Sequence, residues 1–464
     1  MVKIITMQTL IFKIYSNLPI FFQNLVVSTY GLYWKKRRFG GVFEKQVDLF
    51  RSRNSFSKQQ WNEYQEKELR KLLVHAFTNV PFYQKKYMDA GYNLGDFQTF
   101  KLTDLNKLPF LEKEELRQFG KTELLSNTRN KGDFYSSSGS TGTPVNTYFT
   151  SNFHQKWSAA FEVRIREWAG VNRYNCRAMI GGRLVVPVSQ KKPPYFRFNR
   201  FENQLYFSIN HLSKLTAKSY IESMNKFGVE YLTGYANSIW LLAKYGIDLN
   251  INSLKLKSVI TSSEKLTELM RKDISNFFKC KVYDSYSGVE CCGLISEYEN
   301  GTLHWSPDLA VMESIKKDTL EGDLRELICT GLLNFDQPLI RYRIGDLVSL
   351  SSDKIFESKI EMPVIKEIVG RTDDIVTLKD GRQLGSFNRF FADIIGLSKV
   401  QVIQNTHLHF HLNVVKSDDF DESTIKQIRS VFQNRIGEVK LTFDFIKEIP
   451  TSKNGKFKAV ISKI

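Results

Sequence analysis

The sequence predicts an α/β fold with more than one domain, and three observations lead to this prediction. The chain has 464 residues, more than a single hydrophobic core usually organises. Residues 258–286 alternate strand, helix and strand, a pattern typical of a parallel sheet covered by helices. From residue 399 onward a second α/β alternation closes the chain, so we expect a compact C-terminal unit.

Local patterns give the order of the elements. Apolar spacing and capping residues predict the helices, and β-branched or aromatic runs predict the strands. The predicted elements are helices within 56–90 and 103–119, strands at 145–150 and 176–188, helices at 213–228 and 236–246, strand Ser258–Ile260, helix Leu266–Phe278, strand Lys281–Tyr286, short strands within 302–350, a strand and hairpin at 368–384, and a helix near 422–435.

The chain is basic, with 66 Lys and Arg against 49 Asp and Glu, a formal charge of +17 with His neutral. Such a charge favours nucleic acid, anionic lipid, or an anionic substrate such as a nucleotide or an acidic sugar. Because the excess is dispersed and no recognition motif is present, we expect no nucleic-acid partner. A solvated basic surface explains the charge equally well.

Five cysteines without C-x-x-C spacing disfavour a disulfide framework and a zinc knuckle, and they indicate a reducing compartment. A structural metal involving Cys292, His304 or Cys329 is the weaker alternative. We therefore expect a cytoplasmic protein.

The first 41 residues are apolar, but polar residues interrupt every run before it reaches the ~18–20 residues that span a bilayer. The segment also lacks a clean signal-peptide pattern. Two interpretations are open. The favoured one is packing against the main domain, and the other is a helix on the inner membrane surface followed by basic anchors at 35–38.

The stretch YSSSGSTGTPV, residues 135–145, has the composition of a phosphate-binding loop. A Walker loop ends in Gly-Lys-Ser/Thr at the start of a helix, whereas this stretch has no lysine and runs into a predicted strand. Backbone N–H groups and hydroxyls would hold the phosphate, with conformational freedom from Gly139 and Gly142. A surface turn can have the same composition, so the assignment of a phosphate-binding loop depends on further motifs in the chain.

Four later stretches support this assignment: DSYSGVE (284–290), RYRIGD (341–346), VGRTDD (369–374) and PTSKNGKFK (450–458). In order and spacing, the five segments resemble the core motifs of the adenylate-forming superfamily, which includes acyl-coenzyme A synthetases, nonribosomal-peptide adenylation domains and luciferases. The resemblance implies a large N-terminal domain, 1–370, and a small mobile C-terminal domain, 371–464, with a hinge near 370–374.

Longer stretches of the sequence point to one branch of this superfamily. Residues 18–46, 75–85, 181–213 and 231–246 are similar to the capsule-biosynthesis branch of phenylacetate–coenzyme A ligase-like proteins. The similarity covers nearly the whole chain, and it marks residues 1–55 as an N-terminal extension of that branch.

The resemblance also assigns roles by position. Asp346 would accept hydrogen bonds from both ribose hydroxyls, and Glu290 would be a Mg²⁺ ligand. Tyr286, between Ser285 and Ser287, would lie against the adenine. The loop residues that would hold the β- and γ-phosphates are Ser136, Ser137, Ser138, Gly139, Ser140, Thr141, Gly142 and Thr143.

Three residues of the last two motifs complete the site that the resemblance implies. Arg371 would be a second ribose or phosphate contact, and Asp373 would be the hinge. Lys456 would reach the reacting carboxylate and the α-phosphate, where a positive charge stabilises the developing negative charge.

Two positions depart from the family pattern. Val289 removes a hydroxyl that often precedes the glutamate, and Ile344 replaces the usual threonine before Gly345. For Arg343, a nucleotide contact and a plain carboxylate pair are both open.

The acyl pocket is expected from 231–240 and 259–264, with Tyr235, Ala236 and Ser262 as wall residues. A polar, aromatic insert supplies further candidates that either hold an acidic sugar or amino-acid carboxylate or serve the structure. These candidates are Arg183, Arg197, Arg200 and His211.

The sequence therefore predicts a ligase that uses ATP and Mg²⁺ to convert a carboxylic acid into an acyl-adenylate. The acyl group would pass to an amine or a thiol in surface-polysaccharide biosynthesis. An aryl- or acyl-coenzyme A ligase that uses coenzyme A is one alternative, and a non-catalytic membrane-associated scaffold is another.

Overall fold

The fold is that of a computed structural model, which describes residues 12, 14–136, 145–187, 189–316, 323–350, 360–371, 376–379, 383–384, 391, 394–450 and 458–464, with residues 371, 383, 384, 434 and 435 described in backbone only. The chain forms two compact units. Unit 1 comprises Met1–Asn54, Ser151–Ser285 and Ser296–Gly301, and unit 2 comprises Ser55–Thr150, Tyr286–Ile295 and Thr302–Ile464.

Unit 1 is built on a mostly parallel sheet with the strand order β9-β8-β7-β6-β3-β5-β4. Neighbours from β8 to β5 pair in parallel, and β4 pairs antiparallel with β5 at the edge. The strands are β3 Arg177–Gly181, β4 Phe196–Asn199, β5 Gln204–Ser208, β6 Tyr231–Tyr235, β7 Ser258–Ser262, β8 Lys281–Tyr286 and β9 Ile295–Glu297. The helices are α2 Ile20–Phe39, α3 Phe43–Ser52, α8 Ser151–Phe161, η3 Glu162–Glu167, η4 Arg200–Glu202, α9 Ala217–Lys226, α10 Ala236–Asp248 and α11 Glu268–Phe278.

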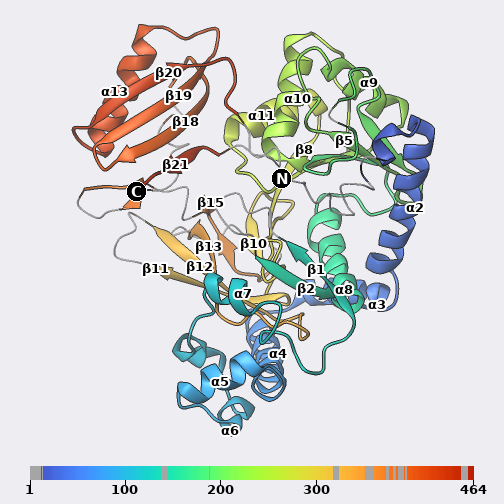
Figure 1. Ribbon diagram of the computed structural model, residues 1–464, viewed down its shortest axis with the longest axis vertical. Coiled ribbons are helices and arrows are strands. Elements are labelled where there is room, and N and C mark those ends of the chain that lie inside the picture. Colours follow the sequence, from blue (N-terminus) through green and yellow to red (C-terminus); the bar gives the residue numbers. More distant parts are fainter. Residues whose placement is uncertain are drawn as a thin grey trace, which may run out of the picture. The chain divides into compact units, whose positions relative to one another are not determined.

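Helices α9, α10 and α11 pack beside this sheet (Figure 1). Buried side chains such as Leu242 of α10, Phe278 of α11 and Val259 of β7 belong to one apolar cluster. The strand–helix–strand unit predicted at 258–286 is therefore confirmed as β7, α11 and β8, with β7 and β8 parallel. Gly234 in β6 has φ +151°, and a Cβ there would lie 1.9 Å from the Ile180 carbonyl oxygen, so only glycine fits between β6 and β3.

Unit 2 contains an antiparallel sheet, β11-β12-β13-β15, the hairpin β1–β2, and the pair β10–β14. Its strands are β1 Gly132–Ser136, β2 Asn146–Thr150, β10 Leu303–Trp305, β11 Ala310–Lys316, β12 Leu324–Gly331, β13 Tyr342–Ser349, β14 Val364–Ile365, β15 Glu367–Arg371, β16 Val376–Thr377 and β17 Gln383–Leu384. Its helices before residue 120 are α4 Lys58–Asn79, α5 Pro81–Asp89, α6 Leu94–Gln98, η2 Leu102–Lys107 and α7 Lys113–Phe119, and the short η1 Arg53–Ser55 lies at the junction of the two units.

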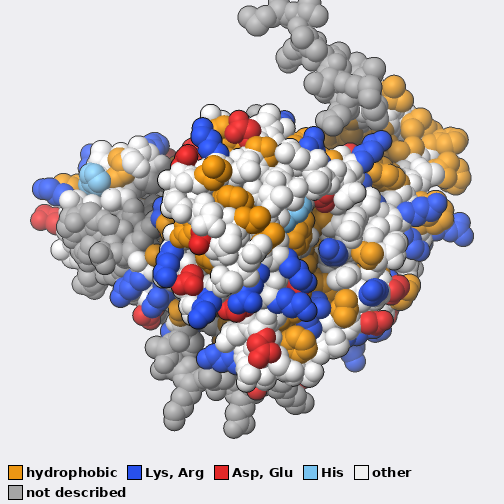
Figure 2. Space-filling model, turned by 90° about the horizontal axis from the view of Figure 1, so that it is seen from below, with side chains coloured by type: hydrophobic (Ala, Val, Ile, Leu, Met, Phe, Trp, Pro, Cys, Tyr) orange, Lys and Arg blue, Asp and Glu red, His pale blue; other side chains and the backbone are white. Residues whose placement is uncertain are grey.

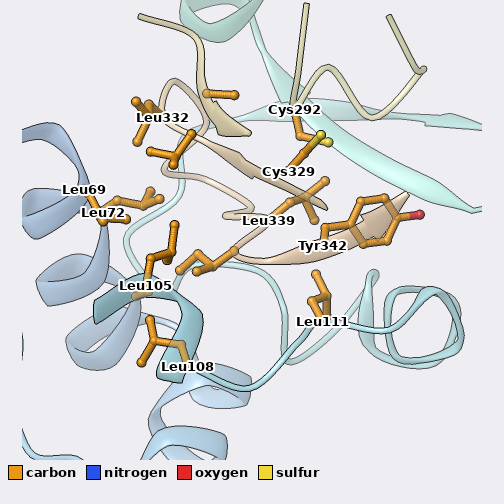
Figure 3. Close-up of a cluster of buried hydrophobic side chains, with 14 of the residues drawn as sticks. Leu69, Leu72, Leu105, Leu108, Leu111, Cys292, Cys329, Leu332, Leu339 and Tyr342 are labelled. Atoms are coloured by element: carbon orange, nitrogen blue, oxygen red, sulfur yellow. The ribbon is translucent and has the colours of Figure 1, made fainter. Parts of the chain in front are cut away.

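The core of unit 2 joins distant parts of the sequence. Leu69 and Leu72 of α4 face Leu339 and Tyr342 in one buried cluster that also contains Cys329 (Figure 3). Helix α4 begins with a capping box, in which Ser57 Oγ accepts from the Gln60 N–H and the Gln60 side chain accepts from the Ser57 N–H. The helices predicted within 56–90 and 103–119 are confirmed.

The C-terminal part of unit 2 has an apolar cluster of its own, formed by residues 376–460. Its sheet has the order β20-β19-β18-β21, and α13 joins the parallel strands β19 and β20. The elements are β18 Leu397–Thr406, β19 His409–Lys416, α13 Glu422–Arg435, β20 Lys440–Phe445 and β21 Val460–Ser462. The predicted α/β class is confirmed, with helix-covered sheets and a small C-terminal α+β part. The boundary near 370–374 stays a prediction.

No helix among the described residues is both long enough and apolar enough to cross a bilayer.

Candidate active site

Several predicted site residues of unit 1 gather at one edge of its sheet. Tyr235, Ser262 and Ser285 are register partners at the carboxyl ends of β6, β7 and β8. Ala236 follows as the first residue of α10. Ligands of open parallel sheets bind outside the carboxyl ends of the strands. The edge therefore has the place in the fold that an acyl pocket requires.

A partly buried network supports this edge at Asp284, a residue to which we assigned no role from the sequence. Asp284 Oδ1 accepts from Thr261 Oγ1 at 2.9 Å and from the Ser285 N–H at 3.0 Å. The Asp284 N–H donates to Glu297, whose carboxylate also binds Arg271 in two bonds of 2.9 and 3.0 Å. Burial raises the pKa of Asp284 to about 7. The motif that begins at Asp284 is thus anchored before it reaches Tyr286.

In unit 2, two tyrosine–carboxylate hydrogen bonds join the DSYSGVE and RYRIGD motifs. The Tyr286 hydroxyl donates to Asp346 Oδ2 at 2.5 Å, across a sequence separation of 60 residues. The Tyr342 hydroxyl donates to Glu290 Oε1 at 3.2 Å, across 52 residues. Each motif supplies one tyrosine and one carboxylate, so the bonds are reciprocal. This arrangement brings Tyr286, Glu290 and Asp346 together.

The protonation of the two tyrosines fixes the direction of these bonds. Burial, with the neighbouring Asp346 carboxylate, raises the pKa of Tyr286 well above its usual range. Burial, with the Glu290 carboxylate, raises the pKa of Tyr342 in the same direction. Both hydroxyls therefore stay protonated and act as donors. Asp346 and Glu290 keep further lone pairs for other partners.

Gly288 and Ile344, one of the departures from the family pattern, lie beside Glu290. A Cβ on Gly288 would lie 2.5 Å from Glu290 Oε2 and 3.2 Å from Ile344 Cδ1. The absence of a side chain at Gly288 thus leaves space for the carboxylate, and Ile344 closes the same space with an apolar group.

Glu290 offers a limited but suitable site for Mg²⁺. No group of three or more His, Cys, Asp or Glu within the described ranges is arranged to hold a metal ion. Mg²⁺ is commonly held by one or two carboxylates together with substrate phosphates, so a single glutamate fits that mode. The ring nitrogens of His304 bond Thr302 Oγ1 and the Met362 carbonyl, and this gives His304 a structural role.

Strand β2, which follows the serine-rich loop, is tied to the segment that leads into β13. The Tyr148 N–H donates to Gln337 Oε1 at 2.8 Å, and Asn334 Nδ2 donates to the Tyr148 carbonyl at 3.1 Å. Thr150 Oγ1 donates to Asp336 Oδ2 at 3.0 Å. The strand predicted after the loop is confirmed as β2. Ser136 ends β1, and its hydroxyl donates to Asn146 Oδ1 at 2.7 Å.

The arginines of the RYRIGD motif serve the structure. Arg341 Nε and Nη2 donate to the two oxygens of Glu313 at 3.0 and 2.8 Å. Arg343 lies over the Phe110 ring and forms ion pairs of 3.4 Å with Glu112 and 3.9 Å with Glu326. Of the two interpretations of Arg343, the structure therefore favours the carboxylate pair.

Arg371 ends β15, and its backbone is the register partner of Asp346 in β13. The start of the VGRTDD motif thus adjoins the RYRIGD motif. The predicted site residues Ser137, Ser138, Gly139, Ser140, Thr141, Gly142, Thr143, Asp373 and Lys456 lie outside the described residues, as does the side chain of Arg371. Ser287 is exposed, and its hydroxyl donates to the Gly288 carbonyl.

The insert of unit 1 mixes structural and accessible residues. Arg197 is fully buried and donates hydrogen bonds to Gln23, Gln190 and the Phe196 carbonyl, so it supports the fold. His211 Nδ1 lies 2.7 Å from Ser208 Oγ, just beyond the carboxyl end of β5. Arg183 is exposed beyond the end of β3 and donates to the Tyr206 hydroxyl at 3.3 Å. Arg200 is exposed on η4.

The chain is similar to known proteins along most of its length. A family model described as the CapK C-terminal domain matches residues 379–463. The chain is 29% identical to protein CapK of Staphylococcus aureus over 97% of this chain and 99% of that protein. It is 25% identical to a phenylacetate-coenzyme A ligase of Pseudomonas putida over 68% of this chain and 72% of that protein.

The fold has a solved counterpart. The structure of a 2-hydroxyisobutyryl-CoA ligase in its postadenylation state, in complex with R3-HIB-AMP, superposes with a TM-score of 0.67 at 16% identity. The match covers 89% of this chain and 91% of that one. Fold and motifs together define the class as the adenylate-forming ligases, a class of enzymes. Within that class, the chain is similar to CapK and to the phenylacetate-coenzyme A ligases.

Proposed function

We propose that the protein is an ATP-dependent, AMP-forming ligase that activates a small carboxylic acid as its acyl-adenylate. The observation that carries the proposal is the reciprocal bonding of Tyr286 to Asp346 and of Tyr342 to Glu290. It gathers an aromatic ring and two carboxylates from motifs more than fifty residues apart. The aromatic ring suits the adenine of a nucleotide, and the two carboxylates suit its ribose hydroxyls and a cation bound to its phosphates.

The chemistry assigns each group a task. A carboxylate oxygen of the substrate attacks the α-phosphorus of ATP, the acyl–O–P bond forms, and pyrophosphate leaves. Asp346 would orient the ribose, and the ring of Tyr286 would lie against the adenine. Mg²⁺ at Glu290 would neutralise phosphate charge, and the serine-rich loop and Lys456 would stabilise the charge that develops in this step.

In the second step, an amine or thiol attacks the acyl carbon, loses a proton and displaces AMP. The near full-length similarity to CapK supports a role in surface-polysaccharide biosynthesis. The amine or thiol acceptor is our proposal. Tyr235, Ala236 and Ser262 would line the acyl pocket, with Arg183 and His211 near an acidic group of the substrate. We place the enzyme in the cytoplasm.

The test is a hydroxylamine-trapping screen with the full chain, ATP and Mg²⁺, over uronic acids, amino acids and aryl acids. We expect ATP-dependent hydroxamate from one of these classes and matching ATP–pyrophosphate exchange. Asp346→Asn should abolish most of both signals, whereas Tyr148→Phe, a substitution in the β1–β2 hairpin, is the matched control. Absence of hydroxamate and of ATP binding for every acid would contradict the proposal.

A coenzyme A ligase is the second candidate, and the similarity to phenylacetate-coenzyme A ligases supports it. The two candidates differ in the acceptor. AMP release that depends on coenzyme A would identify the thiol as acceptor. AMP release that depends on an amino acid or amino sugar would identify the amine.

A further inference from the structure

Helix α2 of unit 1 has its polar side against the protein and its apolar side in solvent. The buried residues of this 20-residue helix are Gln23, Ser28, Gly31 and Arg37. Its exposed large side chains include Phe21 at 73% and Tyr30 at 59% exposure. Figure 2 shows apolar side chains gathered on this part of the surface. The pattern is the reverse of an ordinary surface helix.

The polar face of α2 is used to cover a sheet edge. Strand β4 ends the sheet of unit 1, so its outer N–H and C=O groups need partners. Asn24 Oδ1 accepts from the Phe198 N–H at 3.0 Å, and the Ser28 hydroxyl donates to the Phe198 carbonyl at 3.2 Å and accepts from the Arg200 N–H at 3.1 Å. These bonds fix the rotation of the helix about its axis and hold the apolar face outward.

The backbone approach at Gly31 makes this rotation specific. A Cβ at Gly31 would lie 2.2 Å from Asn199 Nδ2, so a larger residue would push the helix away from the edge. Gln23 Oε1 accepts from the buried Arg197 Nε at 2.6 Å, which anchors the first turns. The outward apolar face is therefore a stable feature of the fold. Its members are Phe21, Phe22, Leu25, Val26, Tyr30 and Tyr33.

Charge indicates what covers this face. The first 43 residues contain six basic side chains and no acidic one. Lys36 is exposed on the apolar side of the last turn, where a long side chain reaches the headgroup level of a lipid surface. At the other end of α2, Lys191 and Lys192 are exposed on a loop tied through Gln190 to Arg197.

We infer that α2 docks on an anionic lipid surface, with its axis in the plane of the membrane. An aromatic and aliphatic face about 20 Å long, with basic residues at both ends, fits an interfacial helix. Anionic headgroups complement the charge, whereas a second copy of this chain would bring two basic segments together. The inference does not depend on the adenylating activity.

The test is flotation of the full chain with phosphatidylcholine vesicles that contain or lack phosphatidylglycerol. We expect binding to the anionic vesicles, weakened by high salt. The variant Phe21→Ser/Leu25→Ser/Tyr33→Ser should bind the anionic vesicles at least about tenfold more weakly than the parent. The matched control Leu215→Ser/Ile247→Ser/Leu269→Ser changes exposed apolar residues elsewhere in unit 1 and should bind as the parent does.

Three outcomes would overturn the inference. The first is equal flotation of the α2 variant and the parent. The second is loss of binding on deletion of residues 1–11 alone, which would assign the contact to that segment. The third is a dimer in sedimentation that the α2 substitutions dissolve, without lipid binding by the parent. Melting curves of each variant exclude unfolding as the cause, and flotation requires no ATP.

Discussion

The hydrogen bond between Tyr286 and Asp346 provides the sharpest test of how the motifs converge. Tyr286→Phe removes the hydroxyl 2.5 Å from Asp346 Oδ2 and keeps the ring against the core of unit 2. A hydrogen bond to a charged group contributes about 1.5–3 kcal/mol to stability. Asp346 is only 9% exposed, so water replaces little of the lost bond. We expect unit 2 to lose about 2 kcal/mol of unfolding free energy.

A double-mutant cycle isolates this contact. Tyr286→Phe, Asp346→Ala and the double variant would be unfolded in denaturant and followed by fluorescence. Each transition would be fitted separately, because a chain of two units is not expected to unfold in one step. The unfolding free energy that Asp346→Ala loses through its cavity is the same on both sides of the cycle and therefore cancels. We expect a coupling free energy of about 1.5–3 kcal/mol.

The control pairs Asp346→Ala with Tyr148→Phe, because the Tyr148 hydroxyl donates to the Asn130 carbonyl in another part of unit 2. Those two changes should add within about 0.5 kcal/mol. If the Tyr286/Asp346 pair were equally additive, the two motifs would not be coupled and the proposed nucleotide site would lose its main support.

Three further predictions concern separate parts of the molecule. Lys456→Ala should lower the adenylation rate by on the order of 10²–10³-fold with less effect on ATP affinity, and unimpaired ATP–pyrophosphate exchange would refute this role. Tyr342→Phe frees Glu290 Oε1, so the rate of ATP–pyrophosphate exchange should depend less strongly on the Mg²⁺ concentration. An unchanged Mg²⁺ titration of this rate would count against Glu290 as the ligand. Asp284 stays protonated in the fold up to a pKa of about 7 but ionises near its ordinary value when unfolded. Its contribution therefore makes the unfolding free energy fall as pH rises between about 4 and about 7, by up to about 1.4 kcal/mol per pH unit. Asp284→Asn should remove that slope in denaturant titrations, and an identical slope in the variant would contradict the shift.

The sequence predicted most elements because their signals are local. Apolar spacing and the capping residues Ser57 and Gln60 locate α4, and the run at 258–286 contains the whole of one βαβ unit. The strand predicted at 176–188 is shorter in the structure, where β3 ends at Gly181. The pairing of β3 with β5 and β6 ends at Gly181 and Ile180, and beyond it the Arg183 side chain donates to the Tyr206 hydroxyl of β5.

The candidate site was predicted in part. Tyr286, Glu290 and Asp346 were named from motifs, and the structure places them together. Tyr342 stood in a quoted motif without a role, because nothing in its neighbours reveals a carboxylate 52 residues away. Asp284 was missed for a similar reason, since its burial depends on Thr261, Arg271 and Glu297 from other elements.

By itself, the sequence determined most of the helices and strands and indicated which motifs are candidates for nucleotide chemistry, because both signals lie in residues close along the chain. Only the tertiary structure decided which tyrosine bonds which carboxylate, and that α2 faces outward with its apolar side. The reason is physical. Hydrogen-bond partners such as Tyr286 with Asp346, or Asn24 with the edge of β4, are selected by long-range packing, and no local pattern encodes that packing.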